Sequence, residues 1–214
     1  MPQTSPQGSV AIIASARQTT EELFLLKKLA VKLGALTASV ARTGEADKLL
    51  VAADSNPNTN GARLNGFAAA DLSKVAAGIA AGSIKTLIVF GEDVTAHGIG
   101  ADLLAKLETL VVSDILPNAT TAAATHLLPG AAHAEKRGTF LNVKGRLQKF
   151  IKAVEAPGDA RAEWEFLHDI VLGVTGQDGF VSIEGLFNQM AKEVPAFAGL
   201  EWAKVGDTGV NVPL

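Results

Sequence analysis

The chain has 214 residues, a formal net charge of −3 and neither cysteine nor tyrosine. This length is enough to bury a core without disulfides, and the lack of cysteine excludes disulfide bonds, Cys-ligated zinc, thiolate catalysis and Cys-ligated iron–sulfur clusters on this chain. A sequence pI of about 5.8 argues against nucleic-acid binding, which usually requires a basic face. No apolar run is long enough for a membrane span and the first residues do not resemble a signal peptide. We therefore expect a soluble, cytoplasmic protein without direct membrane insertion.

Residues 1–8 are rich in Pro, Ser, Thr and Gln, and this composition predicts a flexible tail. Residues 9–214 are predicted to form a single α/β domain, because no later change in composition suggests a linker. Within it, the apolar run 9–14 predicts a strand that is buried on both faces.

The segment 19–34 carries the signals of a helix at both ends. Thr19 and Glu22 have the spacing of a capping box, and Gly34 follows the last apolar residue. Residues 36–41 then predict a second strand, which a right-handed crossover would place parallel to the first.

The stretch 42–67 departs from the alternation of strands and helices, since its Asn, Pro and Gly residues indicate turns. It is predicted to be an irregular excursion, either an ordinary surface loop or a functional one. The alternation of helices and strands then resumes with a predicted helix that has Asp71 as its N-cap and Gly82 at its end.

Residues 86–91 give the clearest central strand, because they are almost continuously apolar. Ligands of open α/β sheets bind outside the carboxyl ends of the strands. The polar residues that follow this strand are therefore a candidate site: Glu92, Asp93, Thr95 and His97.

A short helix at 101–107 leads into the stretch 110–148, which is unusually rich in charged and amide residues for an otherwise apolar frame. It predicts a strand, a polar turn, a helix of small residues, and a second short strand that ends at Pro129 and Gly130. A long glycine-containing loop is predicted to follow.

Two further helices are predicted near the C-terminus. The first has Asp159 as N-cap and ends near Gly173, and the second begins at Ser182 and stops before Pro195. From about residue 176 the chain is expected to be a helical and irregular extension. Together these elements predict an α/β fold: a three-layer, Rossmann-like, open and mainly parallel sheet with helices on both faces.

Several common site patterns are absent or incomplete. Gly98 and Gly100 precede a predicted helix, but Leu103 stands where a dinucleotide fingerprint needs its third glycine. His126, His133 and Glu135 lack the i, i+4 spacing of a helical metal site, and His126 is expected to be a partly buried imidazole in a strand. We predict no metal site and no catalytic residue on this chain.

Two sequence segments carry a resemblance to a known family. The first joins Ser113-Asp114, the Thr120-Thr121 helix start, LLPGAA and AEKRGTFLNVKGRLQ, and the second is AVEAPGDARAEWEFLHDI. In this order they resemble the molybdopterin oxidoreductase family. Within that family they are most similar to the C-terminal α/β region of the large peripheral-arm subunit of respiratory NADH:quinone oxidoreductase, complex I. The likeness runs from about Gly8 to Val174.

The resemblance implies what the chain could bind. Family members hold a bis-molybdopterin guanine dinucleotide between two related α/β domains, and the positions that match their cofactor-contacting residues are Gly91, Glu92, Asp93 and Asp114. The complex I version keeps the fold without molybdenum, and its iron–sulfur clusters lie on an N-terminal part that this sequence lacks. The resemblance therefore implies no cofactor on this chain, or a pterin dinucleotide shared with another domain.

The signature loop can also be interpreted from its residues alone: Pro129, Gly130, Glu135, Lys136, Gly138, Asn142, Gly145, Arg146 and Gln148. Its three glycines are predicted to allow sharp turns, and the Asn142 amide to tie the loop. Arg137 and Arg146 are predicted to pair with carboxylates such as Glu135. This describes a structural clasp; alternatively, Lys136 and Arg146 face a cofactor pyrophosphate or a partner subunit.

Three functions follow as hypotheses. The first is a non-catalytic structural and assembly domain of a complex I type subunit, with other respiratory subunits as partners and a position peripheral to the inner membrane. The second is half of a pterin dinucleotide site in a multi-chain oxidoreductase. The third is a free-standing α/β module that binds a small molecule.

Overall fold

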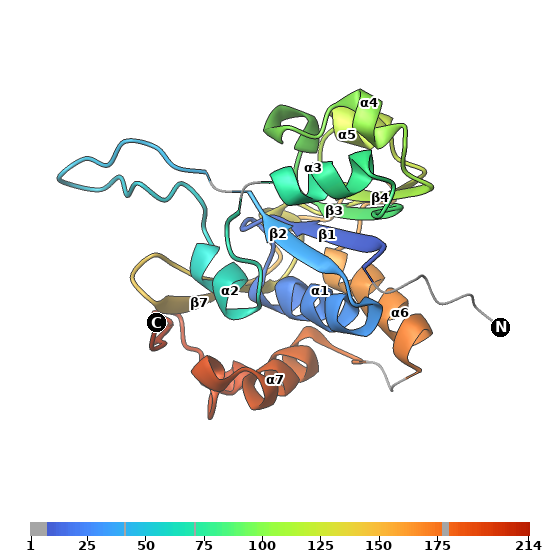
Figure 1. Cartoon of the computed structure of the whole chain (residues 1–214). Coiled ribbons are helices and arrows are strands. Elements are labelled where there is room, and N and C mark those ends of the chain that lie inside the picture. Colours follow the sequence, from blue (N-terminus) through green and yellow to red (C-terminus); the bar gives the residue numbers. More distant parts are fainter. Residues whose placement is uncertain (1–7, 41, 71, 177–179) are drawn as a thin grey trace.

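The computed structural model describes residues 8–40, 42–70, 72–176 and 180–214, and it contains two sheets with helices around them (Figure 1). Residues 1–7 of the predicted tail (1–8) and the predicted cap Asp71 lie outside the described residues. Within the described part, no helix is long and apolar enough to cross a bilayer.

The main sheet has five strands in the order β2-β1-β3-β4-β5, and every pairing is parallel. The strands are β1 (Val10–Ala14), β2 (Leu36–Ser39), β3 (Thr86–Phe90), β4 (Thr109–Asp114) and β5 (His126–Pro129). The chain passes from β1 to β2 on one side and then returns to place β3 on the other side. The direction of strand order therefore reverses between β1 and β3, which is where open α/β sheets form their ligand crevice.

One face of this sheet is covered by α1 (Thr20–Leu33), and α6 (Glu163–Thr175) and α7 (Ile183–Glu193) pack against α1 (Figure 1). The predicted capping box of α1 is confirmed: Thr19 Oγ1 accepts a bond from Glu22 N at 3.1 Å, and Glu22 Oε2 accepts one from Thr19 N at 2.8 Å. Gly34 ends the helix in the left-handed region, with φ at 60°.

The other face carries α3 (Ser73–Ala80), α4 (Ala101–Leu104) and α5 (Ala119–Ala122). Its core is a second cluster of buried aliphatic side chains that includes Ile13, Val89 and Ile79. Helices on both faces confirm the predicted three-layer α/β fold.

The excursion at 42–67 is not wholly irregular, because it contains α2 (Thr59–Leu64). This helix was missed since it is short and includes Asn60 and Gly61, both poor helix formers. Asn58, immediately before it, is fully buried and links two distant segments: its Nδ2 donates to Gln18 O at 2.8 Å, and its Oδ1 accepts from Leu141 N at 2.8 Å.

The prediction of a long loop after β5 was wrong. The segment forms a hairpin of β6 (Gly138–Leu141) and β7 (Arg146–Phe150), joined by β8 (Val210–Asn211) in a three-stranded antiparallel sheet. The prediction for Asn142 is confirmed, since its Oδ1 accepts bonds from Lys144 N and Arg146 N, both at 2.9 Å, and so ties the hairpin turn.

The start of α6 also differs from the prediction, because the helix begins at Glu163 and Asp159 does not cap it. Arg161 N donates to Pro129 O at 3.1 Å, and Arg161 forms a parallel bridge with Gly130. This pairing with the end of β5 keeps the chain extended through Arg161. The predicted start of α7 is confirmed, since Ser182 Oγ accepts a bond from Gly185 N at 3.2 Å.

The signature-loop glycines have two different roles. Gly145 has φ at +77° and fits the predicted sharp turn, whereas Gly130 and Gly138 do not have positive φ. They permit close approach instead. A Cβ on Gly138 would lie 2.5 Å from Thr19 Cγ2, and one on Gly130 would lie 2.7 Å from Glu163 Oε1.

Gly138→Ala is therefore expected to destabilise the fold by about 1–3 kcal/mol, because the added methyl overpacks β6 against the start of α1. The measurement is urea unfolding. The matched control is Gly173→Ala in α6, where no atom lies within 4 Å of the added Cβ and a gain of about 0.5–1 kcal/mol is expected. Equal effects for the two variants would contradict the close-approach role.

Candidate functional site

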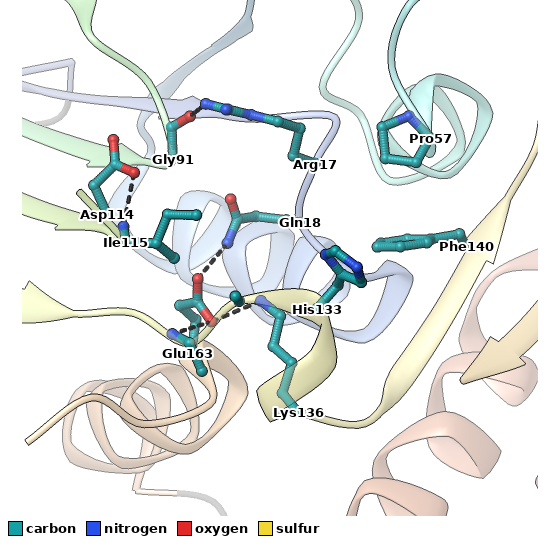
Figure 2. A pocket seen from close by; sticks show the side chains of 12 residues that line it. Arg17, Gln18, Pro57, Gly91, Asp114, Ile115, His133, Lys136, Phe140 and Glu163 are labelled. Atoms are coloured by element: carbon teal, nitrogen blue, oxygen red, sulfur yellow. Dashed lines mark hydrogen bonds and ion pairs between the residues drawn. The ribbon is translucent and has the colours of Figure 1, made fainter. Parts of the chain in front are cut away.

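A cavity of about 380 Å³ opens at the carboxyl edge of the main sheet (Figure 2). Its walls are formed by the residues that follow four of the strands: Arg17 and Gln18 after β1, Gly91 after β3, Asp114 and Ile115 at the end of β4, and Ala131 to His133 after β5. Phe140 of β6 and Pro57 complete the rim, so the hairpin closes a crevice that the parallel sheet begins.

The floor of this cavity contains a buried ionic cluster formed by Glu22, Lys136 and Glu163. Lys136 Nζ lies 3.0 Å from Glu22 Oε1 and 2.7 Å from Glu163 Oε2, and no side chain of the three is more than 4% exposed. The three come from α1, the segment before β6 and the first turn of α6. The cluster thus ties three distant segments together.

Gln18 completes this cluster from the end of β1. Its Nε2 donates to Glu163 Oε1 at 3.1 Å and to Glu22 Oε2 at 3.4 Å. Figure 2 shows Gln18 and Lys136 converging on Glu163 below the cavity. The bonds offset part of the cost of burying charge, which is high for an unpaired group.

The cluster holds two carboxylates and one ammonium, and its pKa values reflect that imbalance. Burial raises the pKa of Glu163 above its ordinary value, and the neighbouring charge of Glu22 raises it further, while Lys136 opposes both. Burial disfavours the charge of Lys136, but the two carboxylates outweigh burial and raise its pKa. The ammonium therefore stays charged and an added proton goes to Glu163.

A third buried carboxyl, Glu21, lies beside this cluster on α1. Its Oε2 accepts from Thr139 N at 2.9 Å, and its Oε1 accepts from Thr139 Oγ1 at 2.8 Å. Burial raises the pKa of Glu21 to about 7. Glu21 thus joins the first turn of α1 to β6.

Two of the four predicted cofactor-contacting positions line the cavity, namely Gly91 and Asp114. Gly91 has φ at +70°, and a Cβ there would lie 2.6 Å from Gln18 Oε1, so only glycine fits. The two oxygens of Asp114 accept bonds from Ile115 N at 2.7 Å and Asn118 Nδ2 at 2.9 Å, and the carboxylate retains room for further donors.

The other two positions do not line the cavity. Glu92 is fully buried and forms an ion pair with Arg42, with a 2.6 Å bond from Nη1 to Oε1. Asp93 accepts bonds from Thr95 Oγ1 and Thr120 Oγ1, both at 2.7 Å. Burial acts to raise the pKa of Asp93, but these hydroxyl bonds outweigh it and lower the pKa. Thr95 and His97 lie outside the cavity on the short 3₁₀ helix Val94–His97.

Arg137 and Arg146 were predicted to pair with carboxylates such as Glu135, and the prediction holds for Arg137, although with a different carboxylate, and is wrong for Arg146. Arg137 pairs with Glu184 at the start of α7, and Arg146 Nε donates to Thr208 O. Glu135 instead accepts a bond from Ala132 N at 2.8 Å. The arginines extend to C-terminal elements that are far away in sequence, so sequence spacing could not reveal these partners.

The remaining loop residues have ordinary positions. Gln148 is exposed on β7, opposite Phe140 in the strand register. His126 is exposed at the start of β5, contrary to the prediction of a partly buried imidazole, because β5 is an edge strand. Among the described residues, no group of three or more His, Asp or Glu side chains is arranged to hold a metal ion.

Sequence reasoning missed four residues of the site: Arg17, Gln18, Glu22 and Glu163. Glu22 was identified only as a helix cap, a role that it also has. Glu163 carried a weak signal as an acidic residue near a predicted helix start. Arg17, at the rim, donates to Gly91 O across the carboxyl ends of β1 and β3.

Comparison with known proteins gives consistent matches. Residues 11–171 match the family model described as molybdopterin oxidoreductase. The chain is 35% identical over 156 residues to the NADPH-Fe(3+) oxidoreductase subunit alpha of Geobacter sulfurreducens, which covers 71% of this chain and 18% of that one. It is 35% identical over 137 residues to the F420-dependent formate dehydrogenase 1 subunit alpha of Methanococcus maripaludis, covering 61% of this chain and 20% of that one.

A solved structure is similar in fold. Acetylene hydratase from Pelobacter acetylenicus superposes with a TM-score of 0.52 and 16% identity, over 70% of this chain and 22% of that chain. At this identity the likeness concerns the fold alone. The chain spans about a fifth of the length of the curated relatives named above, which match it over 18% and 20% of their sequences.

Proposed function

This chain belongs to the molybdopterin oxidoreductase family, and on that premise we propose that it is a non-catalytic structural and assembly domain of a multi-subunit oxidoreductase of the complex I type. The observation that carries the proposal is the first turn of α1. In a Rossmann-like sheet the helix after β1 receives a phosphate at its N-terminus. Here that turn carries two buried glutamates, Glu21 and Glu22.

The residues present do not fit the pyrophosphate of a pterin dinucleotide. Glu22 and the Thr19 side chain already fill the cap of α1, and a carboxylate there repels phosphate. The cavity has two basic side chains of constant charge, Arg17 and Lys136. Lys136 is neutralised by two buried carboxylates, so of these two side chains Arg17 alone keeps a charge that could face a dianion, and its guanidinium already donates to Gly91 O.

The narrower assignment to complex I rests on the signature motif and on composition. The order Pro-Gly-Ala, Glu-Lys, Gly-Thr and Asn-x-x-Gly-Arg-x-Gln resembles that of the complex I subunit, and the chain has no cysteine with which to hold an iron–sulfur cluster. Electron carriers and any contact with a membrane would then come through partner subunits. The names of the relatives, both alpha subunits, support a role within an assembly.

A second candidate is half of a pterin dinucleotide site that another domain completes. It is supported by the positions of Gly91 and Asp114 in the cavity wall and by the spare acceptor capacity of Asp114. Under this candidate, Asp114→Asn would abolish cofactor retention in the assembled enzyme. A free-standing small-molecule module is the third candidate, supported by a cavity whose volume is at the small end of the range for ligand pockets.

Affinity capture of the tagged chain from its native host separates these candidates. The proposed function predicts co-elution of iron-containing oxidoreductase subunits in fixed proportion, with no molybdenum or pterin bound to the tagged chain. Stoichiometric pterin fluorescence on the chain would favour the second candidate. Elution without any respiratory subunit would favour the third.

A further inference from the structure

Residues 43–54 form an arm that projects from the body of the protein between β2 and α2 (Figure 1). The arm closes on itself at its base, where Thr43 and Asp54 form an antiparallel bridge and Gly44 N donates to Ala53 O at 2.8 Å. It is therefore a narrow antiparallel excursion, anchored at one end.

The tip of the arm consists of three consecutive apolar residues that face solvent. Leu49 is 84% exposed, Leu50 is 87% exposed and Val51 is 53% exposed. Isolated exposed leucines are common on protein surfaces, but three in sequence at the end of a projection form a contiguous apolar patch. Such a patch is unfavourable in water unless another surface covers it.

The tip is held in one conformation by a single carboxylate. Asp47 Oδ1 accepts bonds from the backbone N–H groups of Leu49, Leu50 and Val51, at 2.8, 2.7 and 2.8 Å. Asp47 N in turn donates to Val51 O at 3.0 Å. The apolar side chains are thus presented on an ordered turn, which lowers the entropy cost of docking.

The charge of the arm and the names of the relatives indicate what covers the tip. The arm carries Glu45, Asp47 and Asp54 against one base, Lys48, a net charge of −2. This charge disfavours an anionic lipid surface and nucleic acid. Both relatives named above are alpha subunits, a name that implies partner subunits, and a partner's surface is the occupant that the charge of the arm leaves open.

We propose that the arm is a docking element whose tip, Leu49 to Val51, inserts into an apolar pocket bordered by basic residues on a partner subunit of the same oxidoreductase. This inference rests on the proposed function and deepens it, because it assigns the surface through which the domain assembles. Asp47 shapes the tip, and the leucines fill the pocket.

The test compares capture of host oxidoreductase subunits by the full chain and by two variants. Leu49→Ser/Leu50→Ser is expected to lower the yield of co-eluting subunits at least about tenfold, since it removes the apolar anchors. Lys48→Ser is the matched control at the same turn and should capture as the unaltered chain does. Thermal melting verifies folding, and both variants should melt as the unaltered chain does because these side chains are exposed.

The outcomes are distinguishable. Equal capture by the double variant and the unaltered chain would overturn the docking role and leave the proposed function intact, whereas no capture by the unaltered chain would overturn both. A photo-crosslinking residue at Leu50 should react with a co-eluting subunit beside basic residues. Reaction with lipid, or binding of the unaltered chain to vesicles containing phosphatidylserine through the tip, would overturn the proposal in favour of a membrane contact.

Discussion

Lys136→Met is expected to lower the free energy of unfolding by about 3–5 kcal/mol, the usual effect of removing one partner from a buried ion pair. Among the described residues, Lys136 is the only cation that forms an ion pair with either Glu22 or Glu163. Methionine keeps most of the side-chain volume but leaves two carboxylates facing each other in a buried site. Urea unfolding at pH 7, followed by circular dichroism, measures the change.

Two further variants show whether the effect comes from charge. Lys85→Met makes the same substitution in an exposed pair, since the Lys85 and Glu108 side chains are 50% and 65% exposed, and should change stability by less than about 1 kcal/mol. Adding Glu163→Gln to Lys136→Met should restore part of the loss, because only one buried carboxylate then remains unpaired. A double variant no more stable than Lys136→Met would contradict a charge origin.

The parallel sheet could be predicted from sequence because its central strands are almost continuously apolar. The strands that contain Ile12 and Val89 are buried by helices on both faces, so hydrophobicity alone marks them. The helix caps at Thr19 and Ser182 could be predicted equally well, since their hydrogen bonds join residues three apart in sequence. Local signals predict local structure.

The hairpin was missed because its strands are half polar. Leu141 and Leu147 point into the core while their neighbours are polar or partly exposed, and Asn142 to Gly145 form the turn. The alternation of apolar and polar residues is present in the sequence, but the density of charged residues suggested a loop. Strand pairing decided the conformation, and the pairing of β7 with β8 joins residues more than sixty positions apart.

The ionic cluster could not be predicted at all. Glu22 and Lys136 are 114 residues apart, and Lys136 and Glu163 are 27 apart. Each glutamate had a sufficient local explanation as an acidic residue in a first helical turn, and Lys136 was a candidate to face a ligand. Only the packing of α1 and α6 beneath the sheet brings the three charges together.

The free energy of unfolding should fall as the pH rises from about 5 to 8. Burial raises the pKa of Glu21 from 4.5 to about 7, and it raises the pKa of Glu163 as well. Between these values the unfolded chain has released the proton while the folded chain still holds it, so each added unit of pH favours unfolding. Stability from such a group is complete below the unfolded pKa and is lost by about pH 7.

Glu21→Gln isolates one carboxyl of this pair. The rise in pKa from 4.5 to about 7 corresponds to about 3 kcal/mol of unfolding free energy. At pH 8 the free energy of unfolding of the variant should exceed that of the unaltered chain by nearly this amount, and at pH 5 the two should differ little. Its amide can still accept from Thr139 N and donate to Thr139 Oγ1, the two groups that bond Glu21. Urea unfolding at four pH values gives the slope of the unfolding free energy against pH for the variant and for the unaltered chain.

The matched control for the pH series is Glu155→Gln, because the Glu155 side chain is 89% exposed and pairs with Lys152 at the surface. This substitution should change the free energy of unfolding by less than about 1 kcal/mol throughout the series. If Glu21→Gln instead kept the slope of the unaltered chain, the proton would not reside on Glu21, and Glu163 would be the other buried carboxyl whose pKa is raised by burial. Glu163→Gln would then carry the whole change in slope, which places the proton in the floor of the cavity rather than between α1 and β6.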